Sequence, residues 1–218
     1  MIYRVKKTKL TDAPINYGEI IRYAGAKSAD ENLTMLIDDC VKEIKNSDAV
    51  DYSVCYTVLP VKIIDDTVDF SAFSLISKNL SKRLSGASSA LVFACTLSVN
   101  YDRLIKKHSI NNPSRALVLQ AIGAERIESF IDLFVSEYEK QNGIKLSARF
   151  SPGYGDLPLD AQKQIFALLN PQKNIGLTLN DSLIMSPSKS VTAIAGINGC
   201  TDQTGCKTCT NKTCEFRR

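Results

Sequence analysis

Four cysteines near the end of the chain have the spacing of a metal site. Cys200, Cys206, Cys209 and Cys214 follow one another as C-x5-C-x2-C-x4-C. Four thiolates this close together can enclose one zinc ion tetrahedrally, and they can equally ligate an iron–sulfur cluster. The spacing does not separate the two metals, and a tail of free thiols is the alternative. We expect residues 198–218 to form a metal-binding tail, because thiols stay reduced in the cytoplasm.

A second group of chemically capable residues occupies positions 149–155, where the sequence reads RFSPGYG. Arg149 can hold a carboxylate through two parallel hydrogen bonds. Gly153 allows the backbone to approach a ligand closely, and Tyr154 offers a ring that stacks or faces a cation. From spacing alone, a surface ion pair and an ordinary turn explain these residues more simply than a ligand site does.

The elements that must position these residues are a mixture of helices and short strands. A Ser28-x-x-Glu31 capping box predicts a helix start, and Asn112 followed by Pro113 predicts another. We expect helices at 17–25, 28–44, 73–84, 113–141 and 158–169, and strands at 54–60, 61–64, 67–70, 90–97, 145–150, 182–185 and 190–194. Because regular βαβ spacing is absent, the pattern predicts an α+β fold. Residues 1–197 are expected to form one mixed domain with a central, mainly antiparallel sheet flanked by helices.

The remaining reactive side chains are expected to have structural and not catalytic roles. Cys40 lies on the apolar face of an expected helix, and Cys55 and Cys95 lie in expected strands, so all three are predicted core residues. His108, the single histidine, lies beside two lysines near a helix end and is expected to be solvated there. One histidine cannot supply a zinc site with several His ligands.

Composition narrows the function classes. The net charge of +4 is mild, and no basic stretch is interleaved with aromatic residues, so no nucleic-acid partner is expected. No apolar run reaches the length of a membrane span, and the first residues lack the pattern of a signal peptide. We therefore expect a cytoplasmic protein that does not associate with membranes.

The second half of the chain resembles the activation, or reactivation, domain of cobalamin-dependent methionine synthase. That family carries an Arg-x-x-x-Gly-Tyr-x-x-x-Pro signature, a Gly-x-x-Leu-Thr segment and a Ser-Val-Ser segment. The corresponding positions here, the second with a slight shift, are Arg149, Gly153, Tyr154 and Pro158, then Gly176, Thr178 and Leu179, then Ser190, Val191 and Thr192. The motifs IIRYAG, FACTL and AIGAERIES and the Cys-rich tail look like the stand-alone form of this domain.

The resemblance implies a function. It makes the chain an S-adenosylmethionine-binding accessory subunit that supports reductive methylation of cob(II)alamin in trans. The partner, a methionine synthase or another corrinoid protein, carries the cobalamin, and a flavodoxin-like protein donates the electron. The resemblance assigns the ligand's carboxylate to Arg149, its ammonium to Glu128, and further contacts to Ser151, Gly153 and Tyr154.

The sequence is also consistent with a different function. The tail is also consistent with an iron–sulfur or zinc-containing redox or adaptor protein that serves another corrinoid methyltransferase.

Overall fold

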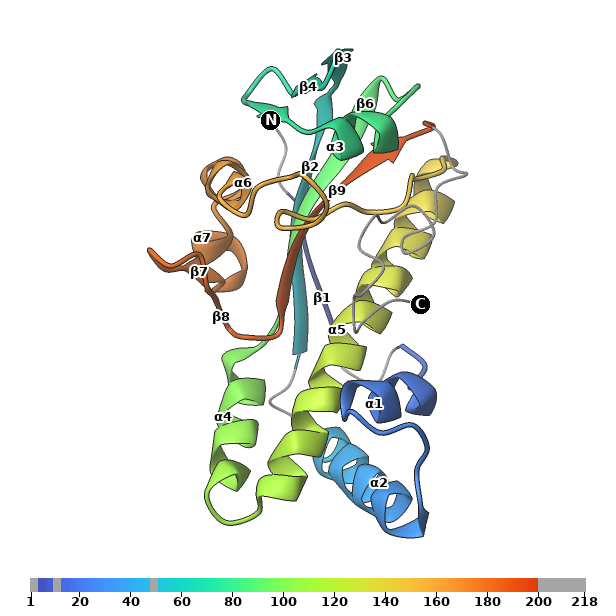
Figure 1. The fold of residues 1–218 in the computed structure, drawn as a ribbon, viewed down its shortest axis with the longest axis vertical. Coiled ribbons are helices and arrows are strands. Elements are labelled where there is room, and N and C mark those ends of the chain that lie inside the picture. Colours follow the sequence, from blue (N-terminus) through green and yellow to red (C-terminus); the bar gives the residue numbers. More distant parts are fainter. Residues whose placement is uncertain (1–3, 10–12, 48–50, 200–218) are drawn as a thin grey trace.

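The computed structural model describes residues 4–9, 13–47 and 51–199. A four-stranded antiparallel sheet, in the order β1-β2-β6-β9, forms its centre. The strands are β1 (Arg4–Lys9), β2 (Asp51–Pro60), β6 (Ser89–Leu97) and β9 (Ser190–Ile197). Figure 1 shows the long helix α5 (Pro113–Asn142) running diagonally along this sheet. The predicted α+β class with a mainly antiparallel central sheet is confirmed.

Strand β6 is the centre of the hydrophobic core. It pairs with β2 on one side and β9 on the other, and eight of its nine residues are buried. Successive side chains point to opposite faces of the sheet, so an uninterrupted apolar run implies cover on both faces. Leu91, Phe93, Cys95 and Leu97 enter one core cluster, and Ala90, Val92 and Ala94 enter the other. The prediction of a central strand at 90–97 is confirmed.

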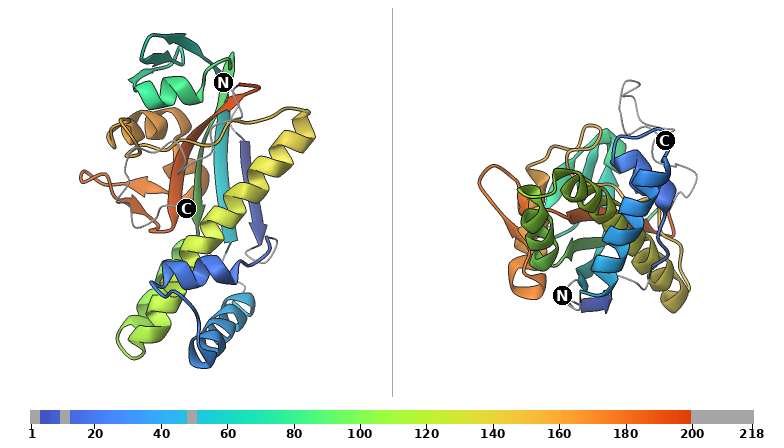
Figure 2. Two further views of the ribbon diagram at one scale, coloured as in Figure 1. Left: turned by 45° about the vertical axis from the view of Figure 1, so that its right-hand side comes forward. Right: turned by 90° about the horizontal axis from the view of Figure 1, so that it is seen from below.

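Helices form the layer on one side of the sheet, where α5 lies against β6 and the others pack against α5. They are α1 (Tyr17–Tyr23), α2 (Glu31–Lys45), α4 (Val99–Ser109) and α5. Figure 2 shows α1, α2 and α4 gathered around the N-terminal half of α5. Tyr52 of β2 stacks on Phe130 of α5, with 4.0 Å between ring centroids, which ties the helix layer to the sheet.

The other face is covered by shorter elements. They are β3 (Lys62–Ile64), β4 (Thr67–Asp69), β5 (Ser74–Ile76), α3 (Lys78–Arg83), α6 (Ala161–Leu169), α7 (Pro171–Ile175), β7 (Thr178–Leu179) and β8 (Met185–Ser186). Strands β3, β4 and β5 form a small antiparallel sheet, and β7 pairs with β8. Phe70, Leu80, Leu157 and Ile165 meet Val92 of β6 in the second core cluster.

Several local predictions are wrong, and three of them show why. The expected helix at 73–84 is strand β5 followed by α3, because Ser77 is extended and its side chain accepts a hydrogen bond from the Leu80 amide. Asp30, not Ser28, caps α2, with its carboxylate accepting from the Leu33 amide. The strand expected at 145–150 forms only the isolated bridges of Leu146 and Phe150 to β9.

The caps of α5 match their predictions. The Asn112 side chain accepts a hydrogen bond from the Arg115 amide, and Pro113 occupies the first turn. Gly143 ends the helix with a φ of 64°, a conformation that glycine adopts without strain. Within the described ranges, no helix combines the length and the apolar character that a membrane crossing requires.

The prediction that His108 is solvated is wrong. Its side chain is only 17% exposed, and its Nε2 lies 2.9 Å from Oε1 of Glu43 on α2. The same carboxylate accepts a hydrogen bond from Arg115 Nε. His108 and Arg115 therefore help to hold α2 against the ends of α4 and α5, a long-range pairing that helix-end preferences alone do not reveal.

A buried ion pair on α5 holds the segment before α1 in place. Arg126 and Glu125 are each 1% exposed and pair through two contacts of 2.6 Å. Arg126 also donates to the carbonyls of Ala13 and Pro14, and the Asn16 amide donates to Glu125. The pair thereby joins the segment before α1 to the middle of α5.

We predict that Arg126→Met lowers the free energy of unfolding by about 3–5 kcal/mol, because it leaves the Glu125 carboxylate buried without its counter-charge. Urea unfolding measures the change. Arg103→Ala is the control, since the Arg103 side chain bonds to Asn100 at an exposed site, and it should shift stability by no more than about 0.5 kcal/mol. A loss below about 1 kcal/mol for Arg126→Met would contradict the structural role given to the pair.

Candidate functional site

Residues 145–150 lie along the outer edge of β9. Phe150 and Ile194 exchange two backbone hydrogen bonds of 2.8 and 2.9 Å. The Ser147 amide donates to the Gly196 carbonyl, and the Ser147 hydroxyl accepts from the Gly196 amide, both at 2.8 Å. This interrupted pairing fixes the backbone on both sides of Arg149 and explains why the segment looks strand-like in sequence.

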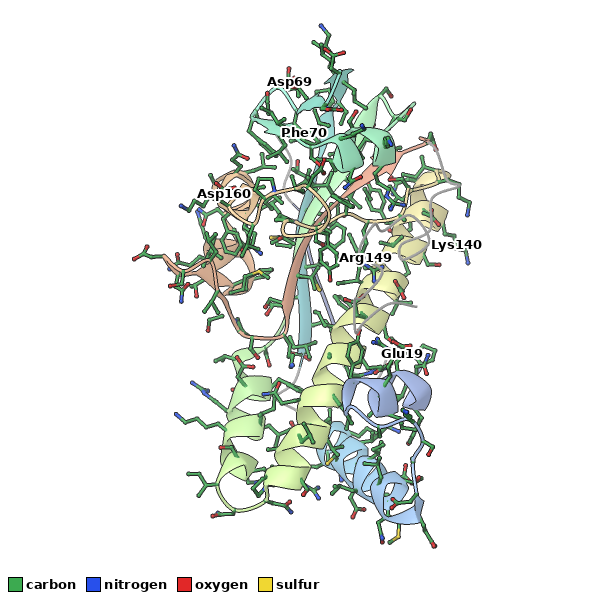
Figure 3. All side chains as sticks on the ribbon, in the orientation of Figure 1. Glu19, Asp69, Phe70, Lys140, Arg149 and Asp160 are labelled. Atoms are coloured by element: carbon green, nitrogen blue, oxygen red, sulfur yellow. The ribbon has the colours of Figure 1, made fainter. Side chains whose placement is uncertain are left out.

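Arg149 is held between two carboxylates of α5. Its Nη2 donates to Glu128 Oε2, and its Nη1 donates to Asp132 Oδ1. Glu128 and Asp132 are four residues apart, so they lie on the same face of the helix. Figure 3 shows the labelled Arg149 beside the C-terminal half of α5. The structure thus brings together two of the predicted site residues, Arg149 and Glu128, and adds Asp132.

Charge and solvent access differ within this cluster, which we call the Arg149 cluster (Arg149, Glu128 and Asp132). Burial lowers the pKa of Arg149, but the two carboxylates outweigh it and hold the pKa above its ordinary value, so the guanidinium stays charged. The exposed fractions of the side chains are 27% for Arg149, 32% for Glu128 and 66% for Asp132. One cation and two anions give the cluster a net charge of about −1.

The loop that follows Arg149 depends on two glycines. Gly153 and Gly155 have φ angles of 87° and 57°, which L-residues rarely adopt. A Cβ on Gly155 would lie 2.4 Å from Nδ2 of Asn79. The Gly153 amide donates to the Leu157 carbonyl at 2.9 Å, which closes a compact turn. Gly155 is therefore required both by its conformation and by the close approach of α3.

Two further predicted site residues lie on this loop. Ser151 is half-buried and accepts a backbone hydrogen bond from the Tyr154 amide at 3.2 Å. Tyr154 is 67% exposed, so much of its ring faces solvent. The five predicted ligand-binding residues thus come from the C-terminal half of α5 and from the segment directly after it.

Asp156 anchors the loop to the N-terminus of α3. Its carboxylate accepts hydrogen bonds from the Ser77 hydroxyl and from the amides of Lys78 and Asn79. Burial raises the pKa of Asp156, but these hydrogen bonds outweigh it and leave the pKa below its ordinary value. Asp156 was not among the residues predicted from the sequence, although a carboxylate near the positive end of a helix is a common stabilising arrangement.

The cysteines divide into two groups. Cys40, Cys55 and Cys95 are buried free thiols, as predicted, and burial raises the pKa of Cys40 to about 11 and of Cys55 to about 12. They stay protonated at neutral pH, which makes them poor metal ligands. Cys200, Cys206, Cys209 and Cys214 lie outside the described residues. In the part of the chain that is described, no group of three or more His, Cys, Asp or Glu residues is placed to hold a metal ion.

We predict that Asp156→Ala lowers the free energy of unfolding by about 1 kcal/mol at pH 7, because it removes the acceptor at the start of α3. Since the folded-state pKa is depressed, this stability is present above the unfolded pKa of about 4 and is lost as the pH falls through the folded value. Unfolding curves between pH 3 and pH 7 should therefore show the difference from wild type shrinking on acidification. Asp160→Ala is the control, since Asp160 makes no side-chain hydrogen bond at the start of α6. An Asp156→Ala effect that grows on acidification would contradict this assignment.

Comparisons with known proteins agree with this architecture. The family model described as "Vitamin B12 dependent methionine synthase, activation domain" matches residues 92–201, which are 110 of the 218 residues. Among solved structures, the chain is similar to "Crystal Structure of the MetH Reactivation Domain bound to AdoHcy", with a TM-score of 0.72 and 14% identity. That similarity in fold covers 94% of this chain and 80% of the other. No curated protein matches the sequence. The matched residues run from β6 through the Arg149 loop to β9, and the chain belongs to the family of the vitamin B12 dependent methionine synthase activation domain.

Proposed function

We propose that this chain binds S-adenosylmethionine at the Arg149 cluster and takes part in the reactivation of a cobalamin-dependent methionine synthase. The observation that carries the proposal is the contact between Arg149 and Glu128, directly before the glycine loop, within the region that the family model matches. The similarly folded MetH reactivation domain is described as bound to AdoHcy, the demethylated product of S-adenosylmethionine.

The chemistry of the donor set suits this ligand. The amino-acid end of S-adenosylmethionine is a zwitterion, and a guanidinium next to a carboxylate offers one group for each of its charges. Arg149 would hold the ligand's carboxylate and Glu128 its ammonium. Ser151 and Gly153 would contribute backbone groups to the ligand, and the exposed ring of Tyr154 would stack on it or face its sulfonium.

In this role the chain positions a ligand and does little bond chemistry itself. When bound, S-adenosylmethionine supplies the methyl group that traps the reduced cobalt of the partner's cobalamin. Arg149 and Glu128 would orient the amino-acid end, and the glycine loop would fix the nucleoside end. The cobalamin belongs to the partner protein, and a flavodoxin-like protein is the proposed one-electron donor. We propose that this exchange takes place in trans, in the cytoplasm, with the chain as an accessory subunit.

We predict that Arg149→Ala weakens S-adenosylmethionine binding at least ten-fold, since a hydrogen bond to a charged group contributes about 1.5–3 kcal/mol. Isothermal titration calorimetry on the full chain measures the effect. Arg103→Ala removes an exposed arginine of α4 and should leave the affinity unchanged. Equal affinity in wild type and Arg149→Ala would exclude the Arg149 cluster as the site.

We further propose that Cys200, Cys206, Cys209 and Cys214 bind a metal. The supporting observation is their C-x5-C-x2-C-x4-C spacing, together with the burial of the other three cysteines, which leaves the tail cysteines as the thiolates suited to ligation. Zinc would make the tail a rigid docking element, whereas an iron–sulfur cluster would make it a path for electrons. The cluster would favour the second candidate function, a redox protein that serves another corrinoid methyltransferase.

We predict that protein purified without oxygen carries stoichiometric zinc or iron, and that the double variant Cys206→Ser, Cys209→Ser loses it. Elemental analysis and the visible spectrum distinguish colourless zinc protein from a brown iron–sulfur protein. If the wild-type chain contains neither metal, the proposed metal site is wrong. The S-adenosylmethionine proposal is tested independently, because Arg149 lies outside the tail.

A further inference from the structure

The Arg149 side chain is already occupied by the protein itself. Its two terminal nitrogens each donate to a different carboxylate of α5, Nη2 to Glu128 and Nη1 to Asp132. A guanidinium holds a ligand carboxylate most specifically when two adjacent nitrogens donate in parallel. A ligand carboxylate that approaches the same two nitrogens therefore competes with Glu128 and Asp132 for their N–H groups.

The two carboxylates differ in how easily they leave. Asp132 is 66% exposed and Glu128 is 32% exposed. A carboxylate that is already largely solvated loses little on release, and exposed ion pairs contribute little to stability. Glu128 is the less solvated partner and is also the group assigned to the ligand's ammonium. Asp132 is therefore the carboxylate that is more easily released from Arg149.

We propose that Asp132 is a specificity-determining residue, a built-in competitor that occupies Arg149 until the α-carboxylate of an S-adenosyl amino acid replaces it. The inference rests on the proposed function and adds a role for a residue that the sequence analysis did not single out. Asp132 holds the guanidinium in place in the absence of ligand. It also makes binding depend on a ligand carboxylate that can displace it. Nucleosides without an amino-acid end therefore gain no affinity from Arg149.

Charge supports the same assignment. With Asp132 on Arg149, the cluster carries two negative groups and one positive group. An S-adenosyl amino acid brings its own carboxylate and ammonium, so both Arg149 and Glu128 keep a counter-charge after Asp132 has left. A ligand that lacks the carboxylate would leave the Arg149–Asp132 pair in place.

The experiment compares two probes by calorimetry. S-adenosylhomocysteine carries the amino-acid end, and 5′-methylthioadenosine carries the same nucleoside and a thioether without it. We expect Asp132→Asn to tighten S-adenosylhomocysteine binding by about two- to five-fold, the range of an exposed ion pair, and to leave 5′-methylthioadenosine binding unchanged. Asp181→Asn, which removes an exposed carboxylate between β7 and β8, should change neither affinity.

The outcomes separate this inference from the proposed function. Unchanged or weaker S-adenosylhomocysteine binding by Asp132→Asn, with binding still lost in Arg149→Ala, would overturn the role of Asp132 alone. Equal tightening for both probes would also overturn it, because the effect would then not involve the ligand's carboxylate. Absence of binding in wild type and in every variant would overturn both proposals.

Discussion

The buried ion pair between Glu125 and Arg126 is the constraint on which the candidate site depends. Both side chains are 1% exposed, and they bind each other and the backbone at residues 13–16. A buried charge that loses its partner is strongly destabilising, so this pair helps to fix the rotation of α5 about its axis. Glu128 and Asp132 follow on the next turns of the same helix. Their direction toward Arg149 is therefore supported by an interaction outside the Arg149 cluster.

Both sides of the site are built on rigid elements. On one side, α5 packs against the sheet through contacts such as the stack of Phe130 on Tyr52. On the other side, Ser147 and Phe150 bind the edge of β9 on either side of Arg149, and Asp156 ties the following loop to α3. Rigid support of this kind holds binding groups in position before a ligand arrives. In the proposed site, the glycine loop between these anchors would contact the ligand's nucleoside end.

Much of the fold could be predicted from local patterns. The apolar run at 90–97 indicated a strand covered on both faces, and the caps at Asn112 and Gly143 defined the ends of α5, since each signal is contained within a few residues. Two of the wrong predictions have non-local causes. Ser77 is held by Asp156, which is 79 positions away, and His108 by Glu43, which is 65 positions away. A family resemblance assigned Arg149 and Glu128 to a common ligand but did not predict their contact with each other, whereas Asp132 could have been found from its position one turn after Glu128.

We propose that a ligand's amino-acid end binds at Arg149 and Glu128 and that its carboxylate replaces Asp132 on Arg149. A crystal structure of the full chain with S-adenosylhomocysteine tests it most directly. We expect the ligand's carboxylate on Arg149, its ammonium on Glu128, and Asp132 released from Arg149 toward solvent. A complex in which Arg149 keeps both carboxylates and the ligand lies elsewhere would contradict it.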